Sequence, residues 1–173
     1  MAENQRHLYR GQIVTLEVAT VLLPNGACLR MECVRHPGGA AVVALDGEGR
    51  VCLLRQYRPV LADWVWELPA GKIEAGEPPL ETARRELAEE AGVTAAEWRS
   101  LGVIVSSPGV FDERIHLFLA RGLAPAAAEM EREATEVFER HWLPLDMARC
   151  WAEEGRIQDA KSVIALLRVR DLP

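Results

Sequence analysis

The sequence predicts an α/β fold preceded by a small antiparallel sheet, and three observations lead to this prediction. Good helix formers run between a Pro-Pro pair at residues 78–79 and Gly92. Strand-like apolar runs flank this stretch on both sides, and residues 8–36 have the pattern of two or three short antiparallel strands. The chain has 173 residues, 49% of them apolar, which suits one domain with its own core and a small appendage.

The appendage is expected at residues 1–38, as an N-terminal sheet, and the main domain at residues 39–173. Residues 14–18 (V-T-L-E-V) alternate apolar and polar side chains, as a half-buried strand does. The turn signal P-N-G at residues 24–26 separates two further apolar runs, so two or three antiparallel strands are expected. The breaker P-G-G at residues 37–39 ends this sheet.

Two apolar strands are expected next, at residues 40–45 and 51–56, and the loop D-G-E-G between them predicts that they pair as a hairpin. The second strand runs into R-Q-Y-R-P, which contains Arg55 and Arg58. Two guanidinium groups at a strand end suit bidentate contacts to phosphate. A pair of solvated charges at a sheet edge is the alternative interpretation.

The helix between Pro79 and Gly92 has two different sides. At about 100° per residue, apolar side chains gather on one side, at Leu80, Ala83, Leu87 and Ala91. Glu86, Glu89 and Glu90 lie on the other side, where three carboxylates repel each other unless a cation lies among them. Hard divalent cations such as Mg²⁺ take oxygen ligands. A solvated acidic surface is the alternative, because charge runs are usually solvated.

The spacing of residues around this helix matches a known pattern. Residues 71–93 resemble the Nudix box, G-x5-E-x7-R-E-U-x-E-E-x-G-U, in which U is a bulky apolar residue. All nine fixed positions are met, by Gly71, Glu77, Arg85, Glu86, Leu87, Glu89, Glu90, Gly92 and Val93. The resemblance implies a Nudix-type α/β/α sandwich around a mixed sheet, with a loop–helix–loop that holds Mg²⁺ or Mn²⁺ against a diphosphate.

The resemblance also implies which residues hold the metal. Glu86 and Glu90 would be the main ligands, and Glu89 would be an additional or outer ligand. The carbonyl of Ala70, just before the box, would add a further ligand. The chemistry implied is hydrolysis of a nucleoside diphosphate linked to another group.

Four further residues are expected to shape the loop. By resemblance, Arg85 would pair with Glu77 and brace the turn rather than take part in the chemistry. Gly71 and Gly76 are expected to let the loop turn tightly, because glycine reaches positive φ at low cost.

Strands are expected after the box at residues 98–106 and 114–120, and the loop S-P-G-V-F-D-E lies between them. Pro108 in this loop stands sixteen residues after Gly92, which resembles the ADP-ribose pyrophosphatases of the Nudix superfamily. The segments R-Q-Y-R and E-L-P-A-G resemble the same group. The resemblance therefore implies hydrolysis of ADP-ribose to AMP and ribose 5-phosphate.

Substrate contacts and a partner are implied by the same resemblance. Arg58, with Arg55 as a second candidate, would bind phosphate. Glu67 and Glu113 would contact hydroxyl groups of adenosine or ribose. Enzymes of this type usually dimerise, so a homodimer is expected in which the N-terminal sheet is exchanged between subunits.

An acidic loop at residues 129–139 leads into a short strand that begins near Phe138. In similar enzymes, a glutamate of this loop swings over the site and activates water. Glu133 and Glu136 are the two candidates for this catalytic base, and Glu89 is the alternative.

Two helices are expected to complete the fold, at residues 144–154 and 158–170, with Gly155 between them. The second presents apolar side chains and is expected to pack on the sheet.

Composition excludes several classes of partner. The net charge of −6 gives no reason to expect a nucleic-acid partner, so an anionic diphosphate must be bound by local positive charge from metal and arginine. No apolar run approaches the length of about 18 residues that a membrane span needs, and the first residues lack the apolar core of a signal peptide. The four cysteines show no metal-binding spacing. They are expected to be buried free thiols in a cytoplasmic protein.

Two other functions stay open at this point. The first is hydrolysis of another nucleotide sugar, such as GDP-mannose or ADP-glucose, because a single sequence does not show which nucleotide base the substrate carries. The second is a non-catalytic Nudix-fold sensor that binds ADP-ribose or a similar ligand and regulates a partner. The intact box argues against the sensor, because pure binding modules often lose these glutamates.

Overall fold

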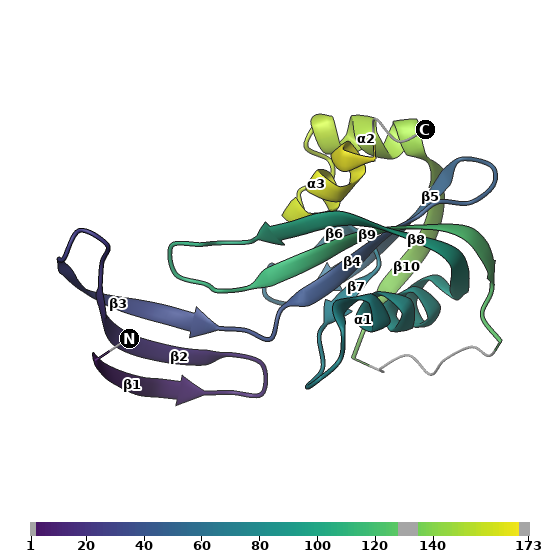
Figure 1. Cartoon of the computed structure of the whole chain (residues 1–173). Helices are drawn as coiled ribbons and strands as arrows, with labels where there is room; N and C mark the ends of the chain where they lie inside the picture. The colour runs from purple at the N-terminus through teal and green to yellow at the C-terminus, as the bar shows by residue number, and fades with distance from the viewer. Residues whose placement is uncertain (1–2, 128–134, 170–173) are drawn as a thin grey trace.

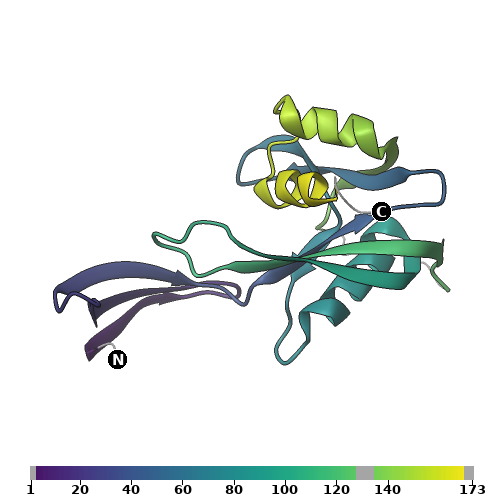
Figure 2. The same ribbon diagram turned by 45° about the horizontal axis from the view of Figure 1, so that its top comes forward.

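The structure, a computed structural model, describes residues 3–127 and 135–169. Within them lie three sheets and three α-helices, one of which continues into a π-helical turn (Figures 1 and 2). The predicted α/β fold with a small antiparallel sheet at the N-terminus is confirmed.

The N-terminal sheet consists of β1 (Glu3–Arg10), β2 (Thr15–Leu22) and β3 (Cys28–Arg35), paired antiparallel in that order. It projects to one side of the remaining elements (Figure 1). The predicted turn connects β2 to β3, and Gly26 in it has a φ of 82°, in the region that glycine adopts at low cost. The alternating pattern and the P-N-G signal therefore located this hairpin correctly.

Two further sheets form the main body. The larger has the order β7-β4-β9-β8, made of β7 (Ala70–Lys72), β4 (Gly39–Ala44), β9 (Arg114–Pro125) and β8 (Val93–Val105). β4 and β9 run parallel and the other neighbours run antiparallel, so this sheet is mixed, as predicted. The smaller, antiparallel sheet has the order β10-β5-β6, made of β10 (Phe138–Pro144), β5 (Arg50–Arg58) and β6 (Asp63–Glu67).

The hairpin predicted for residues 40–45 and 51–56 is wrong. β4 and β5 belong to different sheets and are joined by an isolated bridge between Leu45 and Val51. All of β4 is buried, and so are four consecutive residues of β5. A continuous apolar run shows that a strand is covered on both faces, but it does not identify the neighbouring strand. Here the neighbours come from distant parts of the chain.

Helices cover both faces of the larger sheet (Figure 2). α1 (Pro79–Glu86) and the π-helical turn η1 (Leu87–Ala91) lie on one face, and α2 (Leu145–Glu153) and α3 (Ala160–Arg168) lie on the other. The two C-terminal helices are therefore where the sequence predicts them. Among the described helices, none has the length and apolar character needed to cross a membrane.

Strand β4 separates two hydrophobic cores. Its even-numbered side chains share a core with Leu87 of the first helix, and its odd-numbered side chains share a core with Leu166 of α3. This division follows from the alternation of side chains along a strand. The predicted α/β/α sandwich is therefore confirmed.

The cysteines are free thiols, as predicted, but they are not all buried. Cys33 and Cys52 are buried in strands, whereas Cys28 and Cys150 are exposed. Cys28 begins β3, and Cys150 lies in α2. Apolar neighbours in the sequence do not show which way a single side chain points, so the prediction failed for these two.

Candidate active site

The helix that carries the three glutamates begins and ends where the sequence predicts. Pro78 precedes it in an extended conformation, and Pro79 is the first residue of α1. Gly92 ends it with a φ of 69°, in the left-handed region. The last turn, η1, is a π-helix, which the prediction of a regular α-helix did not include. Nε of Arg140, from β10, donates to the carbonyl oxygen of Glu90 at 2.7 Å and satisfies this helix end.

Two of the three glutamates are buried. The exposed fraction is 8% for Glu86 and 3% for Glu90, whereas Glu89 is only half-buried. Burial raises the pKa of Glu86 to about 7, against the opposing effect of Arg85. Burial also raises the pKa of Glu90 to about 8, although the N–H of Ala70 donates to its carboxylate at 2.7 Å. Both carboxylates are therefore costly to ionise unless a cation lies nearby.

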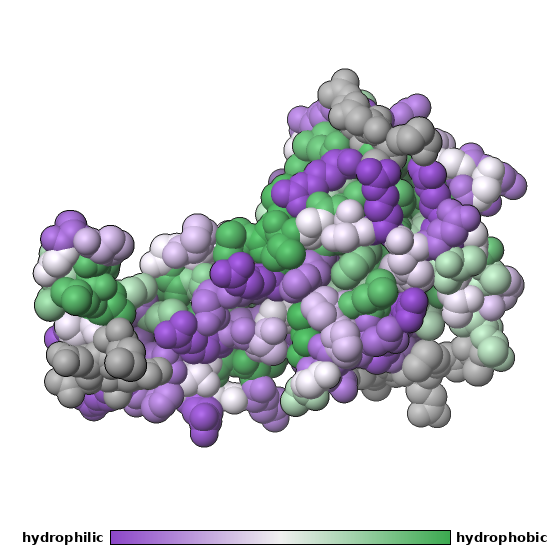
Figure 3. All heavy atoms as spheres, viewed as in Figure 1, coloured by the Kyte–Doolittle hydropathy of each residue, from purple (hydrophilic) through white to green (hydrophobic). Residues whose placement is uncertain are grey.

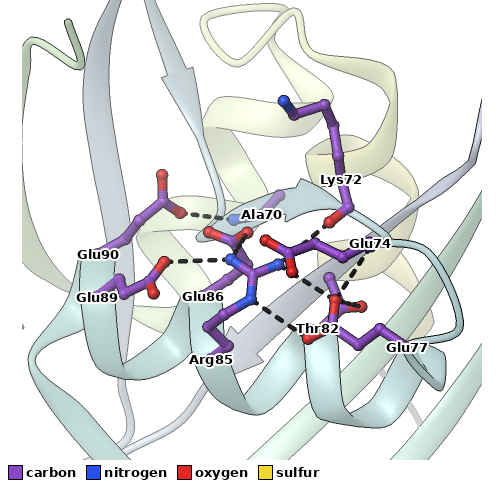
Figure 4. A network of polar contacts seen from close by, with 9 residues as sticks. All are labelled: Ala70, Lys72, Glu74, Glu77, Thr82, Arg85, Glu86, Glu89 and Glu90. Carbon is purple, nitrogen blue, oxygen red and sulfur yellow. Dashed lines mark hydrogen bonds and ion pairs between the residues drawn. The ribbon is translucent and has the colours of Figure 1, made fainter. Parts of the chain in front are cut away.

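Arg85 lies among the carboxylates of the first helix (Figure 4). Its Nη1 donates to Glu86 at 2.6 Å and to Glu89 at 3.2 Å. Its Nε lies 3.3 Å from Oε1 of Glu77, which confirms the predicted pair, and the hydroxyl of Thr82 also donates to Glu77, at 2.7 Å. Arg85 thus ties the loop before α1 to the acidic side of the helix.

Two glycines of the loop have different roles. Gly76 has a φ of 81°, so the prediction that it allows a tight turn is confirmed. For Gly71 the predicted reason is wrong, because this residue lies in β7 and has no positive φ. A Cβ at residue 71 would overlap the carboxylate of Glu86. Glycine is needed at this position to leave room for a side chain of the neighbouring helix.

Gly71→Ala is expected to lower kcat/KM by roughly 10- to 100-fold. The added methyl group displaces the Glu86 carboxylate, and overpacking of this kind costs about 1–3 kcal/mol. Steady-state kinetics and the melting temperature measure the effect. Gly47→Ala is the matched control, because a Cβ there would meet nothing within 4 Å. Kinetics of Gly71→Ala equal to those of the control would remove Glu86 from the site.

The chemistry of this cluster fits a hard divalent cation. Glu86, Glu89 and Glu90 supply carboxylate oxygens, and two of these side chains are buried with only partly compensated charge. Across residues 3–127 and 135–169, no three His, Cys, Asp or Glu side chains are gathered into a ready-made metal site. The carboxylates bond instead to Arg85 and to the N–H of Ala70. The ligand role of the Ala70 carbonyl stays a prediction.

Glu136 is the loop glutamate that lies near this cluster. Its charge contributes to the raised pKa of both Glu86 and Glu90, so it is within electrostatic reach of the two. It is exposed and lies two residues before β10. Glu133, the other candidate for the base, lies outside the described residues.

Comparison with known proteins identifies the family. A profile of the NUDIX domain matches residues 35–167. The chain belongs to the Nudix hydrolase family. The prediction drawn from the spacing of the box is therefore confirmed.

Individual relatives of this Nudix hydrolase cover most of its length. A methanol dehydrogenase activator of Bacillus methanolicus is 43% identical over 162 residues, which are 92% of this chain and 86% of that protein. An ADP-ribose pyrophosphatase of Bacillus subtilis (strain 168) is 37% identical over 162 residues, 94% of this chain and 88% of that protein. A crystal structure of an ADP compounds hydrolase has a TM-score of 0.81 and 25% identity, and covers 99% of this chain and 92% of that chain.

The two predicted phosphate-binding arginines lie on different faces of β5. Arg58 lies on the side of the Nudix box. Its pKa is raised mainly by its hydrogen bonds to Glu67 and further by the charge of Glu90, so its guanidinium is within electrostatic reach of this box residue. Arg55 is three residues earlier, and because side chains alternate along a strand it points to the other face. There its guanidinium lies 5.3 Å from the centre of the Trp64 ring. The structure therefore does not bring the two arginines together.

The two glutamates predicted to contact hydroxyl groups have different surroundings. Glu67 is buried, and both of its oxygens bond to cations: Arg58 donates from Nε and Nη2, each at 2.7 Å, and Nζ of Lys161 lies at 2.6 Å. Glu113 is partly buried and lies 3.4 Å from Nδ1 of His36. It directly precedes β9, at the end of the larger sheet that also holds β7.

Sequence reasoning missed two cations that lie close to the Nudix box. Arg140 comes from β10 and Lys161 from α3, so each reaches the site from an element far along the chain. Neither residue belongs to a sequence motif or spacing that would identify it as part of the site. The only feature of the sequence that sets Lys161 apart is the rarity of lysine, because the chain has two lysines in all.

Proposed function

We propose that this Nudix hydrolase cleaves the diphosphate of ADP-ribose to AMP and ribose 5-phosphate, with Mg²⁺ as the ion and Mn²⁺ as a substitute. The observation that carries the proposal is the pair of buried carboxylates, Glu86 and Glu90, on the box helix. It is supported by the 37% identity to an ADP-ribose pyrophosphatase over 94% of the chain.

Each group at the site has a proposed role. Glu86 and Glu90, with Glu89 and the Ala70 carbonyl, would hold the ion, which when bound supplies charge to neutralise the diphosphate and to orient water. Holding this cation also offsets the cost of two buried negative charges.

Glu136 would accept the proton of the attacking water on a carboxylate oxygen. A bond then forms between the water oxygen and one phosphorus, and a P–O bond of the diphosphate breaks. Arg58 would bind the diphosphate in both the ground state and the transition state. Glu113, which precedes β9, stays a candidate for contacts to ribose hydroxyls.

Arg58→Ala is expected to raise KM for ADP-ribose about tenfold or more and to change kcat much less. A hydrogen bond to a charged group contributes about 1.5–3 kcal/mol, and uniform binding of ground and transition states appears in KM. Arg55→Ala, on the opposite face of β5, is expected to change KM less than about threefold. If both variants keep the wild-type KM, the R-Q-Y-R segment is a structural strand end.

A substrate panel tests the proposal. Initial rates are measured with Mg²⁺ and with Mn²⁺ for ADP-ribose, ADP-glucose and GDP-mannose. The highest kcat/KM is expected for ADP-ribose. A higher kcat/KM for another nucleotide sugar would support hydrolase activity but show that ADP-ribose is not the preferred substrate.

A second candidate function is regulation of a partner enzyme. One observation favours it, which is the 43% identity to a methanol dehydrogenase activator. The complete set of box glutamates supports hydrolysis rather than mere binding. Binding of ADP-ribose without any turnover in Mg²⁺ would favour the regulator.

A homodimer is part of the proposal. The N-terminal sheet of β1, β2 and β3, with its connecting turns, carries exposed apolar side chains, at Leu8, Tyr9, Ile13, Leu22 and Leu29. Figure 3 shows apolar surface on this sheet, at the left of the view. Exposed apolar surface of this kind marks interaction sites. Sedimentation analysis of the whole chain would show a dimer, and a monomer would contradict this role.

A further inference from the structure

A chain of buried charges joins the first turn of α3 to Arg58. Nζ of Lys161 lies 2.6 Å from Oε2 of Glu67 and 3.0 Å from Oδ1 of Asp159. Glu67 in turn accepts two hydrogen bonds from Arg58, each of 2.7 Å. The side chains of Glu67 and Lys161 are only 5% and 13% exposed. A single buried carboxylate thus holds two cations, of which only Arg58 is open to solvent on one side.

Both inner members of this chain are charged. Burial alone would raise the pKa of Glu67, but the hydrogen bonds from Arg58 and the charge of Lys161 lower it to about 2. Burial alone would lower the pKa of Lys161, but Asp159 and Glu67 raise it above its ordinary value. The ammonium has three donors, so it can bond to Glu67 and Asp159 at the same time. The sequence has only one other lysine, Lys72.

The same turn of α3 contacts the segment that leads into the Nudix box. The hydroxyl of Ser162 accepts a hydrogen bond from the N–H of Leu68 at 2.8 Å. Two residues later, the N–H of Ala70 bonds to Glu90. The charge of Lys161 also lowers the pKa of Glu90, against the larger effect of burial, so the ammonium is within electrostatic reach of the box.

We propose that Lys161 is a positioning residue for diphosphate binding: it holds the carboxylate of Glu67, and Glu67 holds the guanidinium of Arg58 toward the substrate. This inference rests on the proposed function, in which Arg58 binds the diphosphate. Without Lys161, Oε2 of Glu67 keeps only the hydrogen bond from Nη2 of Arg58, and the carboxylate is no longer tied to α3. The pair of Glu67 and Arg58 can then shift together, so Arg58 loses its fixed direction. Lys161 does not contact the substrate itself.

A double-mutant cycle between Lys161 and Arg58 tests the proposal. Lys161→Met is expected to raise KM about tenfold, a loss of about 1.4 kcal/mol, and to change kcat less than about threefold. Added to Arg58→Ala, the same change is expected to alter KM less than about twofold, because Lys161 acts through Arg58. Lys161→Arg keeps the cation and is expected to restore KM to within about threefold of wild type.

The cycle separates this role from mere support of α3. A structural role predicts lower thermal stability, equal loss of activity in both backgrounds and no rescue by arginine. Either a wild-type KM in folded Lys161→Met or independent, multiplying effects of the two changes would overturn the proposal. Lys161→Ala, which also removes the donor to Glu67 and adds no bulk, replaces the methionine variant if that variant does not fold.

The substrate used in the cycle distinguishes a failure of the proposed role of Lys161 from a failure of the proposed ADP-ribose hydrolysis. The cycle is run with the compound of the panel that has the highest kcat/KM. If that compound is not ADP-ribose, the proposed substrate is wrong while the role of Lys161 is still measured. A chain that hydrolyses no compound of the panel contradicts both.

Discussion

Glu90→Gln is expected to lower kcat for ADP-ribose by about 10²-fold or more while the fold is kept. Loss of a residue that merely holds a metal ligand costs about 10- to 100-fold, so loss of a charged ligand is expected to reach the upper value. The amide oxygen of glutamine can still accept the hydrogen bond from Ala70 that Glu90 accepts now. Steady-state kinetics across a range of Mg²⁺ concentrations measure the effect.

Glu81→Gln is the matched control for this variant. Glu81 lies in the same helix but on its exposed side, where it pairs with Arg84, so its loss is expected to change kcat less than about twofold. Wild-type kcat and wild-type metal affinity in Glu90→Gln would remove Glu90 from the ligands.

Thermal stability gives a second measurement on Glu90→Gln. The pKa of Glu90 is raised to about 8 in the folded protein, above its ordinary value of 4.5. A raised pKa means that stability is lost as the pH rises through about 8, where the buried carboxylate ionises. At pH 9 without metal, the variant is therefore expected to melt at a higher temperature than wild type. Mg²⁺ is expected to raise the melting temperature of wild type more than that of the variant.

Glu136→Gln is expected to lower kcat by roughly 10²–10⁴-fold and to leave KM little changed. Hydrolysis needs a proton acceptor for the attacking water, and in the proposed mechanism the carboxylates of the box would be engaged by the metal ion. Glu136 is within electrostatic reach of Glu86 and Glu90 and is exposed, so it can approach a bound substrate. A glutamine at this position keeps the size of the side chain and removes the base.

Glu133→Gln and the double variant complete this experiment. If Glu133→Gln shows the large loss and Glu136→Gln does not, the base is Glu133. If both single variants and the double variant turn over at the wild-type rate, the base is elsewhere, and Glu89 becomes the leading candidate.

Local spacing was enough to predict the box helix. Pro78, Pro79 and Gly92 act on the residues next to them, so their effect on the two ends of the helix can be read without the rest of the fold. The pair of Arg85 and Glu77 was available from the family pattern in the same way. The alternating pattern and the P-N-G turn located the N-terminal hairpin for a similar reason.

Contacts between distant segments could not be read from the sequence. The carboxylate of Glu86 needs the space that Gly71 leaves, and this requirement shows only when the helix is packed against β7. Arg55 and Arg58 stand three residues apart and point to opposite faces of β5, but which of them faces the Nudix box is decided by the pairing of β5 with β6, which brings Glu67 to Arg58. Lys161 reaches Glu67 across 94 residues of sequence. In each case the deciding neighbour is set by tertiary packing.

The rate of AMP release from ADP-ribose, as Mg²⁺ is returned to EDTA-treated protein, most directly tests metal-dependent hydrolysis at the Nudix box. We expect no release without the ion, a saturable rise as Mg²⁺ is added, and ribose 5-phosphate in an amount equal to AMP. Release of AMP at the same rate with and without divalent ions would contradict the assignment of Glu86 and Glu90 as metal ligands. Failure of Mg²⁺ and Mn²⁺ to support any release would contradict the hydrolysis of ADP-ribose.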